Sequence, residues 1–263
     1  KRHRTRLNSK LRARLQAAWP LCAHALDRHR VNWEYSNIYL LSVLSKFLLA
    51  PLLPRSDLNA DARAQWRHWL YHTARFGLIE YNSPTYLPVC IFALERLWAF
   101  GPRDLRIQFE RALDYLYFEF AARYHAPSGY LAGAKSRAYA LDLKSGHGYS
   151  ALVAHRQWNL PCQPDSSFMV NWLLAGYVAS PRIRAIALHK PFPIEVKSDL
   201  ANFGISRTDY LAANYTLGSQ TGNHAHPQEI PLFITLRGNK KNHCVFIKPS
   251  FPTAARFASQ QNQ

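Results

Sequence analysis

The stretch EYNSPTY, at residues 80–86, is followed directly by the apolar run LPVCIFALERLWAF, and together they predict a polar turn that opens a buried helix. Ser83 and Pro84 are residue types favoured at the N-cap and the first position of a helix, so we predict a helix over Ser83–Phe100. The acid, phenol and amide at positions 80–82 then lie just outside the helix. Their side chains are placed to line a polar cleft.

Outward from this turn, residues from Leu11 to about Trp172 show apolar side chains three and four positions apart, which is the helical period. Segments that are apolar on nearly all sides alternate with amphipathic ones. This alternation favours paired helices in an inner ring wrapped by an outer ring. The predicted helices span Leu11–Arg28, Asn37–Ala50, Asp61–Phe76, Ser83–Phe100, Pro102–Tyr124 and Tyr149–Trp158.

The pattern changes after Pro193 to short alternating segments separated by Gly, Asn and Pro, which is typical of strands. The segments are IEVKSD, TDYLAANYTLGS, IPLFITLRG and NHCVFIKPS, and GNKKN at residues 238–242 predicts a hairpin loop between the last two. Residues 175–192 show no strong periodicity, so we place a boundary there. The sequence predicts an α+β chain, with a helical domain over residues 1–180 and an antiparallel sheet domain, complete or truncated, over residues 190–263.

The 263 residues are 48% hydrophobic, which is enough for a packed core, and they carry a formal net charge of +17. That charge predicts an acidic partner, which can be an anionic polysaccharide, a nucleic acid or an acidic membrane surface. Seven Lys and Arg residues fall in the first fourteen positions, a pattern that is also typical of a solvated tail. The chain lacks an initial Met, so we expect a piece of a longer protein, and the missing signal peptide says nothing about secretion.

The cysteines Cys22, Cys90, Cys162 and Cys244 are dispersed, and they predict buried thiols rather than a disulfide framework or a metal cluster. The longest apolar run, Ile38–Leu53, is interrupted by polar residues and is too short to cross a bilayer, so it predicts a core helix and no membrane span. No P-loop, GxGxxG or GxSxG motif is present, and no cofactor is expected.

Several motifs together resemble a group of proteins that carry an EYNSPTY motif: EYNSPTY before an apolar helix, a later His, SRAY in a Gly-rich loop, GHG, and the strand segment YLAANYTLGS. That group is similar to the heparinase II/III and alginate-lyase type of polysaccharide lyase. The resemblance covers residues 30–250 in architecture. It implies an incomplete (α/α) toroid of paired helices followed by a C-terminal antiparallel β-sandwich portion. It also implies cleavage of an acidic, uronate-containing polysaccharide by β-elimination.

β-Elimination at a uronate needs a group that neutralises the carboxylate, a base for the C5 proton and an acid for the leaving oxygen. An amide and a guanidinium suit the first task, which points to Asn82 and Arg137. Imidazole and phenol suit the proton transfers, which points to His125 and Tyr139, because burial and neighbouring charge can bring their pKa values toward neutrality. These four residues are the catalytic candidates.

The polar clusters at residues 80–86 and 124–148 both lie at helix ends, so we predict that they meet at one cleft. Aromatic side chains there, together with Trp33 and Tyr35, offer flat faces on which sugar rings can stack. The expected substrate-binding residues are Glu80, Tyr81, Tyr86, Asp142 and His147.

Each candidate also has a structural interpretation. Asn82 is of a type that caps helices, and His125 follows a long helix whose dipole it can complement. Glu80 and Asp142 are alternatively the two carboxylates of a glycoside hydrolase. His224 and His226 are spaced as a metal-binding pair would be, yet no third ligand follows at a recognisable spacing, so no metal site is predicted.

The leading hypothesis is a polysaccharide lyase. A glycoside hydrolase and a non-catalytic glycan-binding or structural protein of the same fold are the alternatives, because a fold does not determine a function. Nucleic-acid binding lacks any RRM, KH or helix-turn-helix signature. An acidic polysaccharide is therefore the expected partner, with an extracytoplasmic or secreted location if the chain is a lyase. The oligomeric state stays open.

Overall fold

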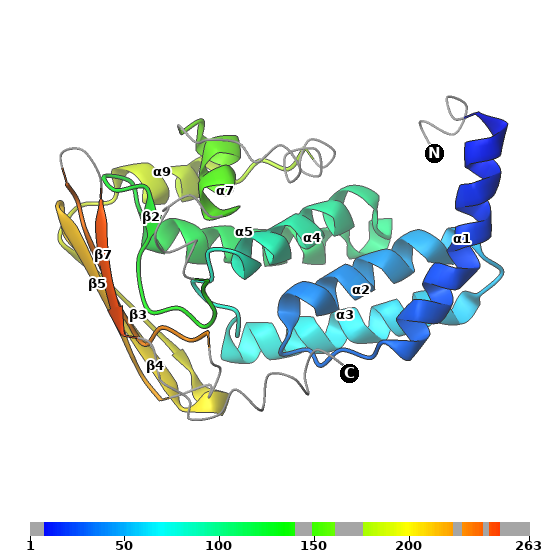
Figure 1. Cartoon of the computed structure of the whole chain (residues 1–263), viewed down its shortest axis with the longest axis horizontal. Coiled ribbons are helices and arrows are strands. Elements are labelled where there is room, and N and C mark those ends of the chain that lie inside the picture. Colours follow the sequence, from blue (N-terminus) through cyan, green and yellow to red (C-terminus); the bar gives the residue numbers. More distant parts are fainter. Residues whose placement is uncertain (1–7, 140–148, 161–175, 223–227, 239–241, 248–263) are drawn as a thin grey trace.

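The structure is a computed structural model, and it describes residues 8–139, 149–160, 176–222, 228–238 and 242–247. The α-helices all precede the main sheet along the chain, so the predicted α+β class is confirmed. The helices are α1 (Ser9–Arg28), α2 (Ser36–Leu49), α3 (Ser56–Phe76), α4 (Tyr86–Phe100), α5 (Arg106–Arg123), α7 (Tyr149–Trp158) and α9 (Pro181–His189). Figure 1 shows the sheet edge-on at one end of the molecule and α1 at the other, with α2 to α5 between them.

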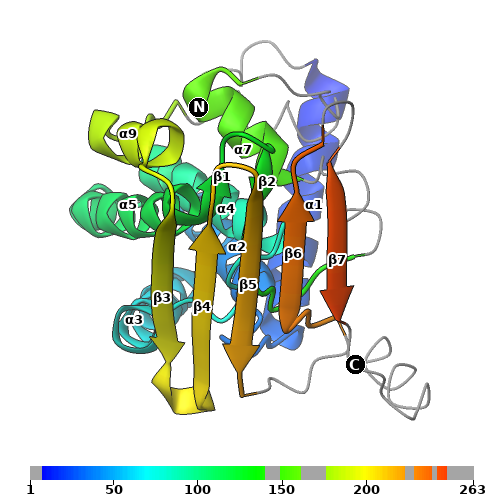
Figure 2. The same ribbon diagram turned by 90° about the vertical axis from the view of Figure 1, so that its left-hand side faces the viewer.

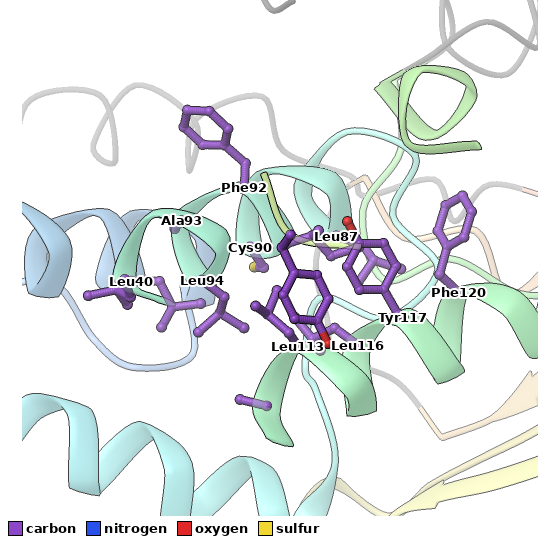
Figure 3. Close-up of a cluster of buried hydrophobic side chains, with 14 of the residues drawn as sticks. Leu40, Leu87, Cys90, Phe92, Ala93, Leu94, Leu113, Leu116, Tyr117 and Phe120 are labelled. Atoms are coloured by element: carbon purple, nitrogen blue, oxygen red, sulfur yellow. The ribbon is translucent and has the colours of Figure 1, made fainter. Parts of the chain in front are cut away.

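The main hydrophobic core lies between α2, α3, α4 and α5. Helices α2 and α4 are apolar on most sides because each packs on two neighbours: α2 contacts α3 and α4, and α4 also contacts α5. Trp66 and Trp69 of α3 are fully buried and stack on each other, with ring centroids 5.5 Å apart. Figure 3 shows Leu87, Cys90 and Leu94 of α4 facing Leu113, Leu116 and Tyr117 of α5, and all six belong to this core. The predicted core helix over Ile38–Leu53 is thus confirmed as α2.

All six predicted helices form: Tyr149–Trp158 matches α7 at both ends, and the other five have at least one shifted end. Helix α4 begins at Tyr86, three residues later than predicted, although the Ser83 hydroxyl still accepts a hydrogen bond from the Tyr86 amide at 3.0 Å. Helix α9 was not predicted, and it lies within residues 175–192, where we placed the boundary for lack of strong periodicity. Its nine residues are too few for a clear period, but Ser180 caps it through the Ile183 amide and Pro181 occupies its first turn.

The strands form a five-stranded antiparallel sheet in which each strand pairs with the next along the chain. The segment TDYLAANYTLGS, predicted as one strand unit, is split between two strands by a tight turn at residues 212–214, closed by the hydrogen bond from Ala212 N to Tyr215 O. The pairing of the last two strands confirms the predicted hairpin. The strands are β3 (Ile194–Leu200), β4 (Ile205–Leu211), β5 (Tyr215–Thr221), β6 (Leu232–Leu236) and β7 (His243–Ile247). Two strands of two residues each, β1 (Tyr124–His125) and β2 (Tyr130–Leu131), pair with each other and were not predicted.

One face of this sheet is covered by helices and the other is open, as Figure 2 shows. The covered face carries charged and polar residues as well as apolar ones, since Arg207, Asp209 and Thr235 are all buried. The open face is charged and polar on β3, where Glu195, Lys197 and Asp199 are exposed, and largely apolar from β5 to β7, where Leu217 and Val245 are 38% and 55% exposed. The usual arrangement, apolar inside and polar outside, is therefore partly reversed.

An ion-pair network joins the covered face to α5. Arg123, the last residue of α5, donates from Nε to Asp209 Oδ2 at 2.6 Å and from Nη2 to Ser198 Oγ at 2.6 Å. Its Nη1 also pairs with Glu119 one helical turn earlier, at 2.9 Å. Because Arg123 and Asp209 are both almost fully buried, this network fixes how the sheet sits on the helix.

The three described cysteines are free, and only Cys90 is fully buried. Cys22 is exposed on α1, so the prediction of a buried thiol is wrong for that residue. Cys162 lies outside the described residues. Within the described part of the chain, no helix combines the length and apolar character that a membrane span requires.

Candidate functional site

The two segments predicted to meet do lie side by side. The backbone amide and the hydroxyl of Ser136 both donate to the Tyr81 carbonyl, at 3.2 and 2.9 Å. On its other side the same loop pairs with residues 228–230, through the bonds from Lys135 N to Ile230 O and from Ala138 N to Gln228 O, each 2.9 Å. The loop that carries Arg137 and Tyr139 is thus clamped between the EYNSPTY turn and the segment before β6.

A buried ion pair lies at the base of this site. Arg137 Nη1 is 3.0 Å from Glu80 Oε1, and Glu80 is only 1% exposed. The second carboxylate oxygen of Glu80 accepts a hydrogen bond of 2.7 Å from the Asn37 amide at the start of α2. Burial raises the pKa of Glu80 to about 7, although Arg137 opposes the shift.

Two tyrosines lie over the guanidinium group of Arg137. Its Cζ is 3.9 Å from the centre of the Tyr86 ring and 5.5 Å from that of Tyr35, within the range of cation–π attraction. The hydroxyl groups of Tyr86 and Tyr139 are hydrogen-bonded to each other. Tyr139 is 41% exposed, so its side chain is on the solvent side of this group. We call Glu80, Tyr86, Arg137 and Tyr139 the tyrosine–arginine cluster.

The contacts between Arg137, Tyr86 and Tyr139 determine what the cluster can do chemically. Burial, and then the hydrogen bond with Tyr139, raise the pKa of Tyr86, so its phenol stays protonated at neutral pH. Two phenols that share a hydrogen bond can pass a proton from one oxygen to the other, and a cation beneath them favours an anion at the same surface. The arrangement can therefore hold an acidic ligand and move a proton next to it.

Asn82 lies near the cluster but faces the protein. It is 2% exposed and adopts a left-handed backbone conformation, with φ of 48°. Its amide donates to the Ala134 carbonyl at 3.0 Å, which supports the loop before Arg137 and not the Ser83 helix. In this arrangement its amide is committed to the backbone, and neither predicted task, carboxylate neutralisation or helix capping, is seen.

Tyr81 belongs to the interface between the turn and the sheet. It is 2% exposed, and its hydroxyl donates to Gln220 Oε1 of β5 at 2.6 Å. The guanidinium of Arg207 lies over its ring at 4.2 Å. Tyr81 therefore anchors the EYNSPTY turn to the sheet, and its ring is not open to a sugar.

His125 is fully buried, and both of its ring nitrogens are bonded within the protein. Nδ1 is 2.7 Å from Ser128 Oγ, and Nε2 is 2.8 Å from the Ala212 carbonyl in the turn between β4 and β5. Burial lowers its pKa, so the neutral form is favoured. Among the described residues no contact joins His125 to the tyrosine–arginine cluster. Its bond to the Ala212 carbonyl instead connects β1 to the sheet.

Asp142, His147, His224 and His226 lie outside the described residues. Gln228, which accepts a hydrogen bond from Arg137 Nε at 3.3 Å, was not predicted, because nothing in the local sequence marks it. Tyr35 was expected only as one of several aromatic residues. In the part of the chain that the structure describes, no group of His, Cys, Asp and Glu side chains is placed to hold a metal ion.

The loop that carries Arg137 and Tyr139 contacts the sheet through a close approach of two glycines, Gly133 and Gly218. A Cβ atom on Gly218 of β5 would lie 2.2 Å from the Cα of Gly133, and one on Gly133 would lie 2.4 Å from Asp209 Oδ1. Gly133 also has a φ of 96°, which side chains other than hydrogen disfavour. The backbone of the loop can therefore lie directly on the sheet only because both residues lack a side chain.

Comparison with known proteins gives one match. A family model described as a domain of unknown function, DUF8769, matches residues 21–180, which is more than half of the chain. No curated protein matches the chain, and no solved structure matches it. The matched region contains α2 to α5 and the tyrosine–arginine cluster. The chain belongs to the family defined by this domain, DUF8769.

Proposed function

We propose that this protein cleaves an acidic, uronate-containing polysaccharide by β-elimination at the tyrosine–arginine cluster. The observation that carries the proposal is the hydrogen bond between the phenols of Tyr86 and Tyr139: the Tyr86 ring lies over the guanidinium of Arg137, and Tyr139 is exposed. The net charge of +17 supports an acidic substrate, since it attracts polyanions over long distances.

In the proposed reaction Arg137 attracts the substrate carboxylate, and the oxygen of Tyr139 takes the C5 proton. The electron pair of the broken C5–H bond forms the C4–C5 double bond, the C4–O bond breaks, and the same proton passes to the leaving oxygen. Tyr139 reacts as a phenolate that has already released its own proton to water, and Tyr86 stabilises this negative charge through their shared hydrogen bond. The phenolate is neutralised when it takes the C5 proton and forms again when that proton passes to the leaving oxygen. The protonation state of Glu80 determines the net charge of its pair with Arg137. When Glu80 is protonated, the full positive charge of Arg137 is available to the substrate.

We further propose that the helices belong to an incomplete (α/α) toroid and the sheet to a β-sandwich portion. The paired packing of α2 with α3 and of α4 with α5 supports the toroid. The largely apolar open face of β5 to β7 supports the sandwich, because a second sheet would remove that face from water. The described residues include no such second sheet.

A non-catalytic glycan-binding protein is the second candidate. Asn82 and His125, two of the four predicted catalytic residues, are committed to hydrogen bonds within the protein, while the aromatic and cationic groups suited to binding remain. A glycoside hydrolase using Glu80 is less well supported, because Glu80 is buried behind Arg137 and does not reach the surface.

The test is incubation of the protein with alginate, heparin, hyaluronan, pectin and neutral glycans while ultraviolet absorbance of the unsaturated uronate is recorded. A rise with an acidic glycan supports a lyase, and new reducing ends without that rise indicate a hydrolase. Tyr139→Phe should abolish the rise. The matched control is Tyr215→Phe, because Tyr215 is 39% exposed on the sheet and lies in another part of the fold. Binding of an acidic glycan without any cleavage would favour the second candidate.

A further inference from the structure

A cavity lies away from the tyrosine–arginine cluster, between the end of α1, α2 and α3. It is a cavity of about 770 Å³, a size typical of small-molecule sites. Its wall includes Trp33, which is held by stacking on His72 with ring centroids 4.4 Å apart. His68 of α3 lines the same cavity, with its ring 6.1 Å from that of Trp33. A fixed aromatic wall of this kind suits the apolar face of a flat ring.

The polar part of the wall is balanced in charge. Three carboxylates and three cations line the cavity, so its net formal charge is zero in a chain whose total is +17. The carboxylates already have cationic partners: Arg55 Nη1 lies 2.7 Å from Asp27 Oδ2, Arg55 Nη2 pairs with Asp57, and Lys46 pairs with Asp61 at 2.5 Å. A cationic ligand would have to displace one of these partners. Arg30 lines the cavity outside these pairs, and because the lining as a whole carries no net charge it favours a neutral ligand.

The arrangement of these groups favours hydroxyl groups in particular. Arg55 lies between Asp27 and Asp57, which places an acceptor, a donor and a second acceptor next to one another. A hydroxyl is both donor and acceptor, so neighbouring hydroxyls on a sugar ring can bond to each member of such a set. These side chains remain accessible: 36% of Arg55, 37% of Asp27 and 63% of Asp57 is exposed.

We infer that this cavity binds a short neutral oligosaccharide, with Trp33 against a sugar ring and the Asp27–Arg55–Asp57 set bonded to its hydroxyls. The inference is independent of the proposed lyase activity, because none of the cluster residues lines the cavity. It gives the protein a binding site for neutral sugar in addition to the proposed site for acidic sugar.

Isothermal titration of the full chain with cellotriose, mannotriose and xylotriose tests the inference, with trigalacturonate as the acidic comparator. We expect at least one neutral trisaccharide to bind in physiological salt. Arg55→Gln should weaken that binding by about 10-fold or more, since a hydrogen bond to a charged group is worth about 1.5–3 kcal/mol. Trp33→Leu should weaken it further, and Tyr139→Phe should leave it unchanged.

Arg63→Gln is the matched control. Arg63 also lies on α3 and pairs with an exposed aspartate, Asp104, at 2.7 Å, but it does not line this cavity. Exposed pairs of this kind contribute little to stability, so both arginine variants should fold, which circular dichroism checks. The inference is overturned if no neutral trisaccharide binds, if trigalacturonate binds more tightly than all three, or if folded Arg55→Gln binds as wild type does. Loss of binding in Arg63→Gln as well would also overturn it.

Discussion

Glu80 shows how one buried carboxylate couples the site to pH. Its pKa of about 7 lies above the ordinary value of 4.5, so the folded protein binds the proton more tightly than the unfolded chain does. The stabilising contribution of this group is therefore complete below the ordinary pKa and is lost as the pH rises through about 7. The difference corresponds to roughly 3 kcal/mol.

Glu80→Gln should remove that pH dependence. The glutamine oxygen can still accept the Asn37 amide, but residue 80 no longer titrates. Urea denaturation at pH 5 and pH 8 measures the free energy of unfolding for both proteins. We expect the wild type to lose about 3 kcal/mol more than the variant between these two pH values. An equal loss in both proteins would mean that Glu80 ionises normally in the folded state.

Tyr139→Phe and Arg137→Ala should differ in their kinetics. The first removes only a phenolic hydroxyl, so kcat should fall by roughly 10²- to 10⁴-fold with KM little changed. The second removes a cation that attracts the substrate in both the ground state and the transition state, so KM should rise as kcat falls. Steady-state kinetics on the best substrate of the glycan panel measures both constants. If Tyr139→Phe cleaves as fast as wild type, Tyr139 does not transfer the proton.

At the scale of the elements, Arg123 carries the junction between α5 and β4. Arg123→Met leaves Asp209 buried without its closest cation, and we expect a loss of about 3–5 kcal/mol of stability. Chemical denaturation checks this, with Arg63→Gln as an exposed-pair control that should cost less than about 1 kcal/mol. The double variant Arg123→Met/Asp209→Asn should be more stable than the sum of the two single effects predicts. Strict additivity would show that the pair does not interact.

The elements also show what sequence could and could not predict. Helices α2 and α4 were predicted because each is an almost continuous apolar run, of 14 and 15 residues, too long for a typical strand. Helix α9 is too short to show a period, and the turn at residues 212–214 lacks the Gly that usually marks a hairpin. Alternation identified the strands but not which face is buried, because Arg207 and Asp209 lie inside, where they form ion pairs with Glu119 and Arg123 of α5.

The candidate site was predictable only in part for a related reason. The meeting of residues 80–86 with residues 135–139 followed from their places at helix ends. The task of each side chain could not be predicted in this way. Asn82 and His125 have the residue types that catalysis needs, yet they bond to the backbone carbonyls of Ala134 and Ala212, which lie far along the chain. Residue type indicates what a side chain can do, whereas only the tertiary contacts show which task it performs.

At the scale of the whole molecule, the position of the loop that carries Arg137 and Tyr139 depends on the sheet. Gly218→Ala adds a methyl group where Gly133 Cα lies, so either the loop or β5 must move, at a cost of about 1–3 kcal/mol. Thermal unfolding measures that cost, and glycan cleavage should fall with it. Ser219→Ala on the same strand is the control. An unchanged melting temperature and unchanged cleavage in Gly218→Ala would contradict this dependence.

The contact between Gly133 and Gly218 also determines where inactivating changes will be found. A screen of random single substitutions for loss of cleavage should recover the tyrosine–arginine cluster, as any mechanism would predict. It should also recover residues 133 and 218, which have no functional group and contact no substrate. The positions least able to vary in this protein then include 133 and 218, where the required side chain is a single hydrogen atom.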